Sequence, residues 1–154
     1  MKLNEIRNEY FYASFGSDLI SAYNEKIESI EKRTAIVIAY DAAAKAVMTR
    51  TTWNWFKKLE YLNQSRKLFI EAIKKDPQNV EIRFLRFTVE DRIPSYLGYS
   101  DHMDEDKEII LKHLSNYDSK GINPEITNFL KDRLRESDAF TQKELIKIEE
   151  KLTT

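Results

Sequence analysis

Aromatic and basic side chains alternate in the stretch between residues 50 and 61. The cluster comprises Arg50, Trp53, Trp55, Phe56, Lys57, Lys58 and Tyr61. Trp, Tyr and Arg often anchor binding surfaces, and a cation beside an aromatic ring can hold a phosphate or a stacked base. The competing interpretation is packing between helices, with buried indoles and with lysine stems covering apolar surface. Two tryptophans so close together cannot both point the same way, so we expect at least one in the core. Trp53, Trp55 and Lys57 are the candidates for partner binding.

A second candidate is the segment from Ile93 to Tyr99, which carries apolar side chains in a loop. Loops are usually polar and often carry function, so Tyr96, Leu97 and Tyr99 are candidate partner-binding residues. Gly98 can supply a turn geometry that other residues avoid. The alternative is that Tyr96 or Leu97 folds back to close one end of the helical layer.

Three arginines form a third candidate, because a guanidinium can fork onto a carboxylate or a phosphate. They are Arg83, Arg86 and Arg92, of which Arg83 and Arg86 are the candidate binding residues. The simpler interpretation is pairing with nearby acids of the same helix, and these are Glu81, Glu90 and Asp91.

Histidines and carboxylates gather after residue 100 and raise the question of a metal. The group is His102, His113, Asp101, Asp104, Glu105 and Asp106. The separation of the two histidines fits no compact ligand motif, and the acidic run lacks the glycine of a calcium loop. Acids at the start of a helix are also favoured by its dipole. We therefore predict no metal and no cofactor.

Catalytic motifs do not stand out. The sequence has no phosphate-binding glycine loop, no G-x-S-x-G and no H-E-x-x-H. A carboxylate pair such as Glu60 with Glu71 could act as acid and base, but nothing singles it out. We name no catalytic residue, and the balance is against an enzyme.

Composition limits the class of protein. The chain has 154 residues, a formal charge of −1, three Gly, three Pro and no Cys. No cysteine excludes a disulfide scaffold, and few turn-forming residues argue against an all-β fold. The near-neutral charge gives no global attraction for nucleic acid, although residues 45–75 are locally basic and residues 101–108 locally acidic. Neither a signal sequence nor a spanning segment is apparent, so we expect a cytoplasmic protein with membrane association unfavoured.

Apolar residues recur at helical spacing along most of the chain and predict eight helices. The expected starts are near Leu3, Ser17, Thr34, Trp55, Val80, Asp104, Pro124 and Thr141, with Ser17, Thr34, Asp104, Asn123 and Thr141 as N-caps and Glu144 completing a capping box with Thr141. The helix after Ser17 has an inward stripe that begins at Leu19, and the helix after Thr34 is apolar on nearly every side, which predicts a central position. The helix that begins at about Trp55 runs to Lys75 and is stopped by Asp76-Pro77. Residues 80–92 are ambiguous, because alternation at Val80, Ile82 and Phe84 suits a strand. We favour a helix there, since a lone strand has no partner.

The segment from Lys57 to Asn79, KKLEYLNQSRKLFIEAIKKDPQN, resembles the second helix of a tetratricopeptide repeat and the turn after it. Ser65 stands at the small-residue position, Phe69 and Ala72 at the aromatic and alanine positions, and Pro77 at the closing proline. The flanking signature positions depart from the repeat. Residues 71–111 also resemble a family of small bacterial helical proteins, which implies the fold and no activity.

Together these features predict one all-α domain over residues 1–154. Seven or eight helices would form antiparallel hairpins stacked as a tetratricopeptide-like superhelix or bundle, with its repeat-like centre at about 34–92. The leading function is a non-enzymatic module that binds a protein or peptide between the Trp53/Trp55 region and the Tyr96–Tyr99 loop. One alternative is a small-molecule or anion site, possibly enzymatic, built from Arg83, Arg86 and Lys57. The other is peripheral membrane binding through tryptophans and lysines, and a homodimer is compatible with all three.

Overall fold

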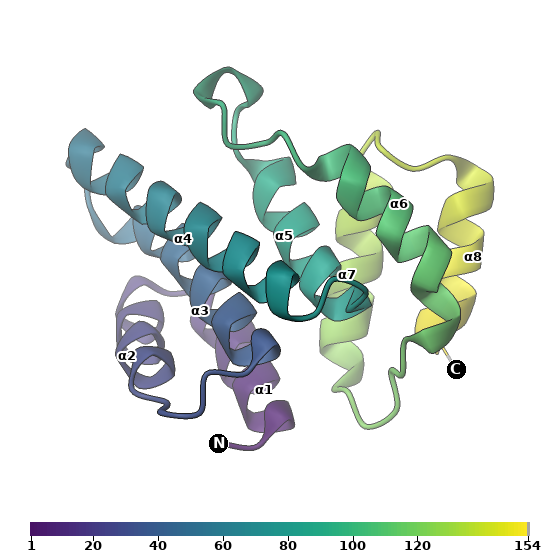
Figure 1. Cartoon of the computed structure of the whole chain (residues 1–154), viewed down its shortest axis with the longest axis horizontal. Coiled ribbons are helices and arrows are strands. Elements are labelled where there is room, and N and C mark those ends of the chain that lie inside the picture. Colours follow the sequence, from purple (N-terminus) through teal and green to yellow (C-terminus); the bar gives the residue numbers. More distant parts are fainter. Residues whose placement is uncertain (154) are drawn as a thin grey trace. The chain divides into compact units, whose positions relative to one another are not determined.

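Helices account for all the regular structure in the computed structural model, which describes residues 1–153 (Figure 1). The eight α-helices are α1 (Leu3–Ala13), α2 (Ser17–Glu28), α3 (Ala35–Met48), α4 (Trp55–Lys75), α5 (Val80–Arg92), α6 (Met103–His113), α7 (Pro124–Glu136) and α8 (Gln142–Thr153). Short 3-10 turns lie at Thr49–Thr51, Ser95–Leu97 and Leu114–Asn116. The all-α prediction and the helix count are confirmed, and the segment after Val80 is a helix.

The chain divides into two compact units, Met1–Pro77 and Gln78–Thr154, called unit 1 and unit 2 below. The boundary follows the proline that ends the tetratricopeptide-like segment. Each unit is described by itself. The single domain and the repeat-like stacking over residues 34–92 stay predictions.

Helix α3 is the centre of unit 1 and contacts α1, α2 and α4. Its sequence is apolar on nearly every side, as expected for a helix with neighbours all round. Ile38, Ala39, Ala42, Ala43 and Ala44 are completely buried. The small alanine side chains allow α2 and α4 to approach the backbone of α3 closely.

Capping residues define where the helices of unit 1 begin. The Thr34 hydroxyl accepts the amide of Val37, and the Asn54 side chain accepts the amide of Lys57. The prediction that Ser17 caps α2 is wrong, because Gly16 takes the extended cap position and Ser17 is the first helical residue.

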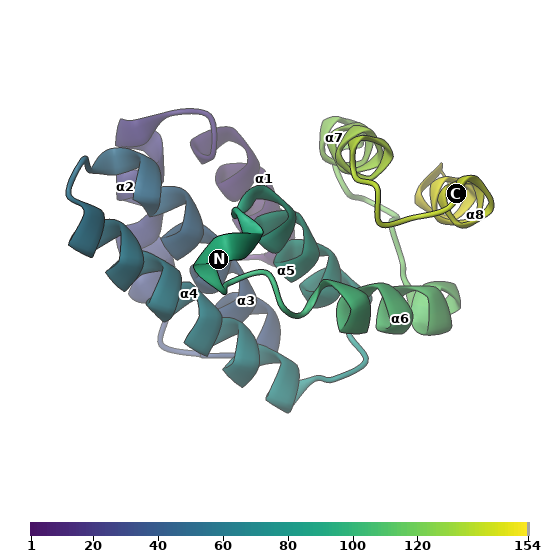
Figure 2. The same cartoon turned by 90° about the horizontal axis from the view of Figure 1, so that it is seen from above.

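Unit 2 contains α5 to α8 around one apolar core. Its centre is formed by Phe87, Ile110, Leu134 and Ile148, one from each helix and each at most 1% exposed. Helices α7 and α8 run side by side in the view from above (Figure 2). At the start of α8, Thr141 and Glu144 form the predicted capping box. At α6 the prediction of Asp104 as cap is wrong, because His102 occupies that position.

Candidate interaction surface

Large apolar side chains are exposed at two turns of unit 1 and on the ends of the helices that flank these turns. We call this set the apolar end: Tyr12, Phe15, Leu19, Trp53, Trp55 and Phe56. Trp53 is 99% exposed, Phe56 82% and Phe15 63%. These six are half of the twelve exposed large apolar residues in the described chain. Single exposed apolar residues are ordinary, whereas clustered ones are typical of contact surfaces, so the apolar end is the candidate site.

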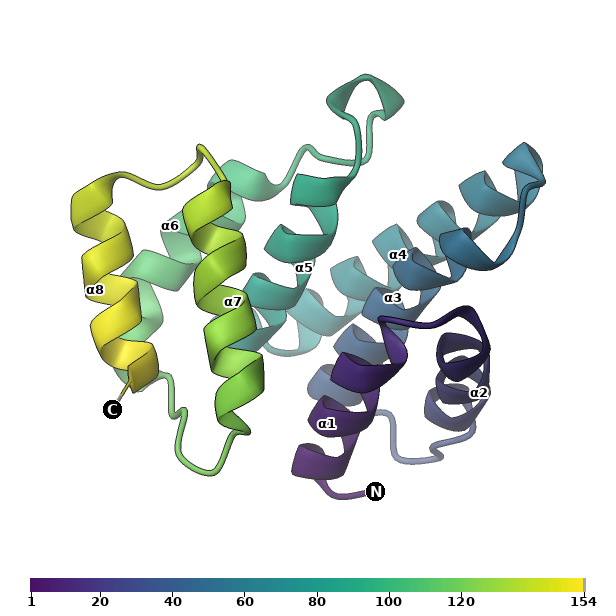
Figure 3. The ribbon, with the colours of Figure 1, turned by 180° about the vertical axis from the view of Figure 1, so that it is seen from behind.

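The alternation of helix directions brings the two turns together. The α1–α2 turn and the α3–α4 turn lie at the same end of unit 1 (Figure 3). Arg50 joins them, because its Nη1 donates to the carbonyl oxygen of Ser14 at 2.8 Å. Within the first turn the Phe11 ring meets the edge of Phe15, with ring centroids 5.2 Å apart.

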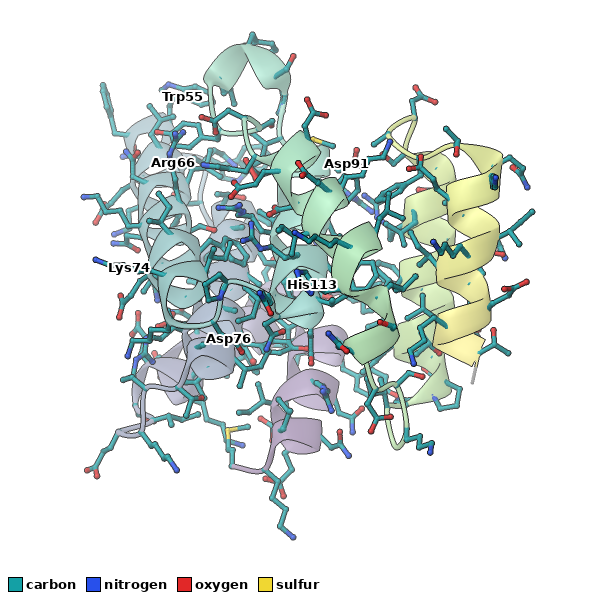
Figure 4. All side chains as sticks on the ribbon, turned by 45° about the vertical axis from the view of Figure 1, so that its right-hand side comes forward. Trp55, Arg66, Lys74, Asp76, Asp91 and His113 are labelled. Atoms are coloured by element: carbon teal, nitrogen blue, oxygen red, sulfur yellow. The ribbon has the colours of Figure 1, made fainter. Side chains whose placement is uncertain are left out.

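Neither tryptophan is in the core, which corrects the expectation that at least one would be. Trp53 lies in the extended turn before α4, and Trp55 is the first residue of that helix and is 52% exposed. Trp55 stands seven residues before Leu62, on the side of α4 that carries the inward stripe of Leu62, Phe69 and Ala72, but in the first turn of the helix half of its surface stays exposed. Trp55, Arg66 and Lys74 are spaced along α4 in Figure 4.

The basic side chains of the apolar end already have partners. Lys57 pairs with Glu60 at 3.4 Å and stands 5.1 Å from the centroid of the Tyr61 ring. Lys58 Nζ donates to the carbonyl oxygen of Thr49 at 2.7 Å. Arg50 also donates to the carbonyl oxygen of Ser14, so Arg50 and Lys58 stabilise the turns by hydrogen bonds to the backbone.

A shallow pocket of about 440 Å³ opens between α1 and α2. Its apolar lining includes Ala13, Ala22 and Tyr23. Tyr12 and Leu19 of the apolar end also line the pocket. Glu9 and Lys26 add a polar part, with Lys26 Nζ 2.7 Å from Glu9 Oε1. The predicted inward stripe of α2 included Leu19, which is instead 58% exposed at this pocket.

The predicted loop candidates belong to unit 2. Tyr96 is 85% exposed, whereas Leu97 and Tyr99 are half-buried. Gly98 has φ of 75°, the left-handed geometry that glycine adopts freely. Below it, the Ser100 hydroxyl lies 2.9 Å from the carbonyl oxygens of both Glu90 and Ile93, which ties the loop to the end of α5.

Arg83 and Arg86 are candidate binding residues from the sequence, but the structure buries both side chains, which corrects that assignment. They are 3% and 4% exposed, and both guanidinium groups meet the completely buried carboxylate of Asp106. Arg83 Nη1 donates to Asp106 Oδ1 at 2.9 Å, and Arg86 donates through Nε and Nη2 at 2.8 and 2.7 Å. Both arginines therefore pair within the chain, as the competing interpretation predicted. Their main partner is Asp106 of α6 and not an acid of their own helix.

The charges around this buried carboxylate reinforce one another. Burial by itself lowers the pKa of Arg86, but the hydrogen bond and charge of Asp106 outweigh it, so the pKa is raised overall. For the half-exposed Glu105, burial raises the pKa. Hydrogen bonds and charges of Arg83 and Arg86 lower it by more, so the pKa of Glu105 lies below its ordinary value. Both shifts favour the charged forms, which is typical of a structural ion network.

Glu90, Asp101 and His102 bring one ligand atom each to within 4.8 Å of the others, the only such group of acids and histidines among residues 1–153. His113 is not part of it. The group also has a structural role, because the His102 amide donates to Glu90 Oε1 at 3.2 Å and His102 Nδ1 lies 3.0 Å from the same oxygen. Glu90 thus caps the start of α6.

Glu90 should make stability depend on pH. Burial raises its pKa, against the lowering effects of His102 and Arg86. A carboxyl whose pKa is raised by folding contributes stability that is present below its unfolded pKa and is lost as pH rises through the folded pKa. The side chain at position 90 of Glu90→Gln cannot ionise. The free energy of unfolding of this variant minus that of the parent should therefore grow as pH rises from the unfolded to the folded pKa of Glu90.

Urea unfolding at a series of pH values measures this difference. Glu108→Gln, at an exposed position of α6, is the matched control and should give a flat difference. A Glu90→Gln difference that stays constant or shrinks with rising pH would contradict the raised pKa.

A second buried ion network lies in unit 1. Asp41 and Lys45 of α3 are 3% and 5% exposed, with Lys45 Nζ 3.2 Å from Asp41 Oδ1. Arg33 binds the other oxygen of Asp41 at 2.5 Å. Lys45 also donates to Asn24 at 2.6 Å and to Glu28. The small-molecule hypothesis gains nothing from either network, because both are filled by the protein's own side chains.

Comparison with protein-family models, curated proteins and solved structures finds no match to this chain. The tetratricopeptide resemblance therefore stays a prediction. Among residues 1–153, no helix is long and apolar enough to cross a membrane.

Sequence reasoning missed three members of the apolar end, namely Tyr12, Phe15 and Leu19. The signal for them was available, since alternating helices place the first and third turns of a bundle at the same end. It placed Asp106 among the acids at the start of a helix and missed its buried pairing with Arg83 and Arg86. Asp106 stands at helical spacing between Met103 and Ile110, on the inward stripe of α6.

Proposed function

We propose that this chain is a non-enzymatic interaction module that binds a protein or peptide through the apolar end of unit 1. The observation that carries the proposal is the gathering of six exposed large apolar side chains on two joined turns. Tryptophan and other aromatic anchors contribute most of the energy of protein recognition when a partner removes them from water.

The non-enzymatic part of the proposal is supported by the buried charged side chains, which are paired with one another and do not face a site for substrate. Asp106, Arg83 and Arg86 hold one another in the interior of unit 2, and Asp41 and Lys45 do so in unit 1. Their charges are used in structural pairs, whereas Trp53 and Phe56 keep most of their surface in water.

The charge pattern favours a protein partner over an anionic membrane. Binding to anionic lipid relies on basic side chains free to face the headgroups. Here Arg50 and Lys58 donate to backbone carbonyl oxygens and Lys57 faces Glu60. We also propose a cytoplasmic location, with which the absence of cysteine is compatible.

The predicted groove paired Trp53 and Trp55 with Tyr96, Leu97 and Tyr99. Those loop residues belong to unit 2, so the proposal depends on unit 1 alone. This makes Tyr96 a useful control, since it is an exposed aromatic residue outside the proposed surface.

Photo-crosslinking tests the proposal. A benzophenone side chain at position 56 should trap a protein in extracts, and the same group at position 96 should not. The trapped protein is then purified and its Kd measured. We expect Trp53→Ala with Phe56→Ala to weaken binding by at least about tenfold, the loss typical of hot-spot residues, with Tyr96→Ala unchanged.

Equal trapping from positions 56 and 96, or an unchanged Kd in the double variant, would contradict the proposal. So would tight binding to phosphatidylglycerol vesicles without any protein partner, because the membrane hypothesis would then replace it.

A further inference from the structure

Unit 1 carries a protruding indole and an unfilled apolar pocket. Trp53 is 99% exposed at the α3–α4 turn, and the pocket of about 440 Å³ lies between α1 and α2. Leu19 belongs to both the pocket and the apolar end. The hydrogen bond from Arg50 to Ser14 keeps the turn that bears the indole beside the turn that leads into the pocket.

The exposed aromatic area is sufficient for a stable interface. Weighted by their exposed fractions, the five aromatic residues of the apolar end could bury about 500–850 Å² per copy, from the usual area of such side chains. A standard protein interface buries about 800 Å² per partner. The apolar end therefore suits a partner of ordinary interface size.

We infer that the partner of the apolar end is a second copy of this chain, in a two-fold dimer where Trp53 of each copy enters the α1–α2 pocket of the other. This inference rests on the proposed function and names its partner. In a two-fold dimer the same patch serves both copies, so each copy must present projection and pocket on one face. The Arg50–Ser14 hydrogen bond holds the turn that bears Trp53 beside the turn that joins α1 to α2, the two helices that line the pocket.

The chemistry of the pocket suits an indole. Ala13, Ala22 and Leu19 offer apolar surface to the ring, and the Glu9 carboxylate can accept the indole N–H. Lys26 beside Glu9 supplies a cation for the ring face.

Sedimentation equilibrium of the full chain over a wide range of concentration tests the inference. We expect a reversible monomer–dimer equilibrium. Trp53→Ala removes the projection, and Ala22→Trp fills the pocket at an exposed position of α2. Each should raise the dimer Kd by about tenfold or more, with Tyr96→Ala as the control that leaves it unchanged. Circular dichroism verifies that the variants stay folded.

Mixing the two variants is the decisive experiment. A copy with Trp53→Ala keeps its pocket, and a copy with Ala22→Trp keeps its Trp53, so their mixture restores one of the two contacts. We expect the mixture to associate more tightly than either variant alone.

A monomer at every concentration, an open polymer, an unchanged Kd in Trp53→Ala, or a mixture no tighter than its components would overturn the dimer. If the chain is monomeric but position 56 still traps another protein, the dimer fails and the proposed function stands. If neither is observed, both fail.

Discussion

Asp106→Ala should destabilise unit 2 by about 3–5 kcal/mol, the usual result of removing one partner from a buried ion network. Asp106 is completely buried and accepts three hydrogen bonds from Arg83 and Arg86. Without it, two guanidinium groups that are at most 4% exposed lose their buried counter-ion, while Glu90 and the half-exposed Glu105 remain beside them. Their lost hydrogen bonds cannot be replaced by water without opening the core.

Urea unfolding followed by circular dichroism measures the loss, and hydrogen exchange locates it. We expect faster exchange in α5 and α6. Glu108→Ala removes an exposed carboxylate from the same helix and should change the unfolding free energy by less than about 0.5 kcal/mol. Equal effects of the two substitutions would show that the Asp106 network is not structural.

Lys45→Ala should have a similarly large effect in unit 1, again about 3–5 kcal/mol. Its ammonium group is buried and contacts Asp41, Asn24 and Glu28. Truncation leaves a cavity beside α3 and deprives the buried Asp41 of one of its two cations. The same unfolding experiment measures the loss, with faster exchange now expected in α2 and α3.

A paired substitution separates lost charge balance from lost packing. Asp41→Leu with Lys45→Met replaces both buried charges by apolar groups of similar volume, and such exchanges are often neutral. Arg33 and Glu28 are partly exposed and can turn to water. The pair should therefore be more stable than Lys45→Ala alone. A pair less stable than the single variant would mean that the polar contacts themselves stabilise unit 1.

Local signals in the sequence predicted the helices well. Thr34, Asn123 and Thr141 act as predicted caps, because a side chain that bonds its own helix needs no distant partner. Helix α4 has the predicted bounds, Trp55 to Lys75, since a turn precedes it and Asp76-Pro77 stops it. The all-apolar pattern of α3 correctly placed that helix at the centre of its unit.

The arginines show where such reasoning stops. A helical pattern assigns charged residues to the outside, yet Arg83 and Arg86 are inside because they pair with Asp106, which follows them by 23 and 20 residues in the sequence. No local pattern contains that pairing. The candidate surface could likewise be predicted only in part. Trp53 and Trp55 were predicted from residue type, whereas Tyr12 and Phe15 follow only from the packing of the helices.

Tryptophan fluorescence tests the central claim most directly, because both tryptophans of the chain are in the apolar end. In dilute solution acrylamide should quench the emission strongly, as expected for indoles in contact with water. Binding of the partner, whether a second copy at high concentration or a trapped protein, should reduce the quenching. Indoles already shielded in the dilute folded chain, or equally quenched once a partner is bound, would contradict the claim that this end of unit 1 is where the protein makes its contacts.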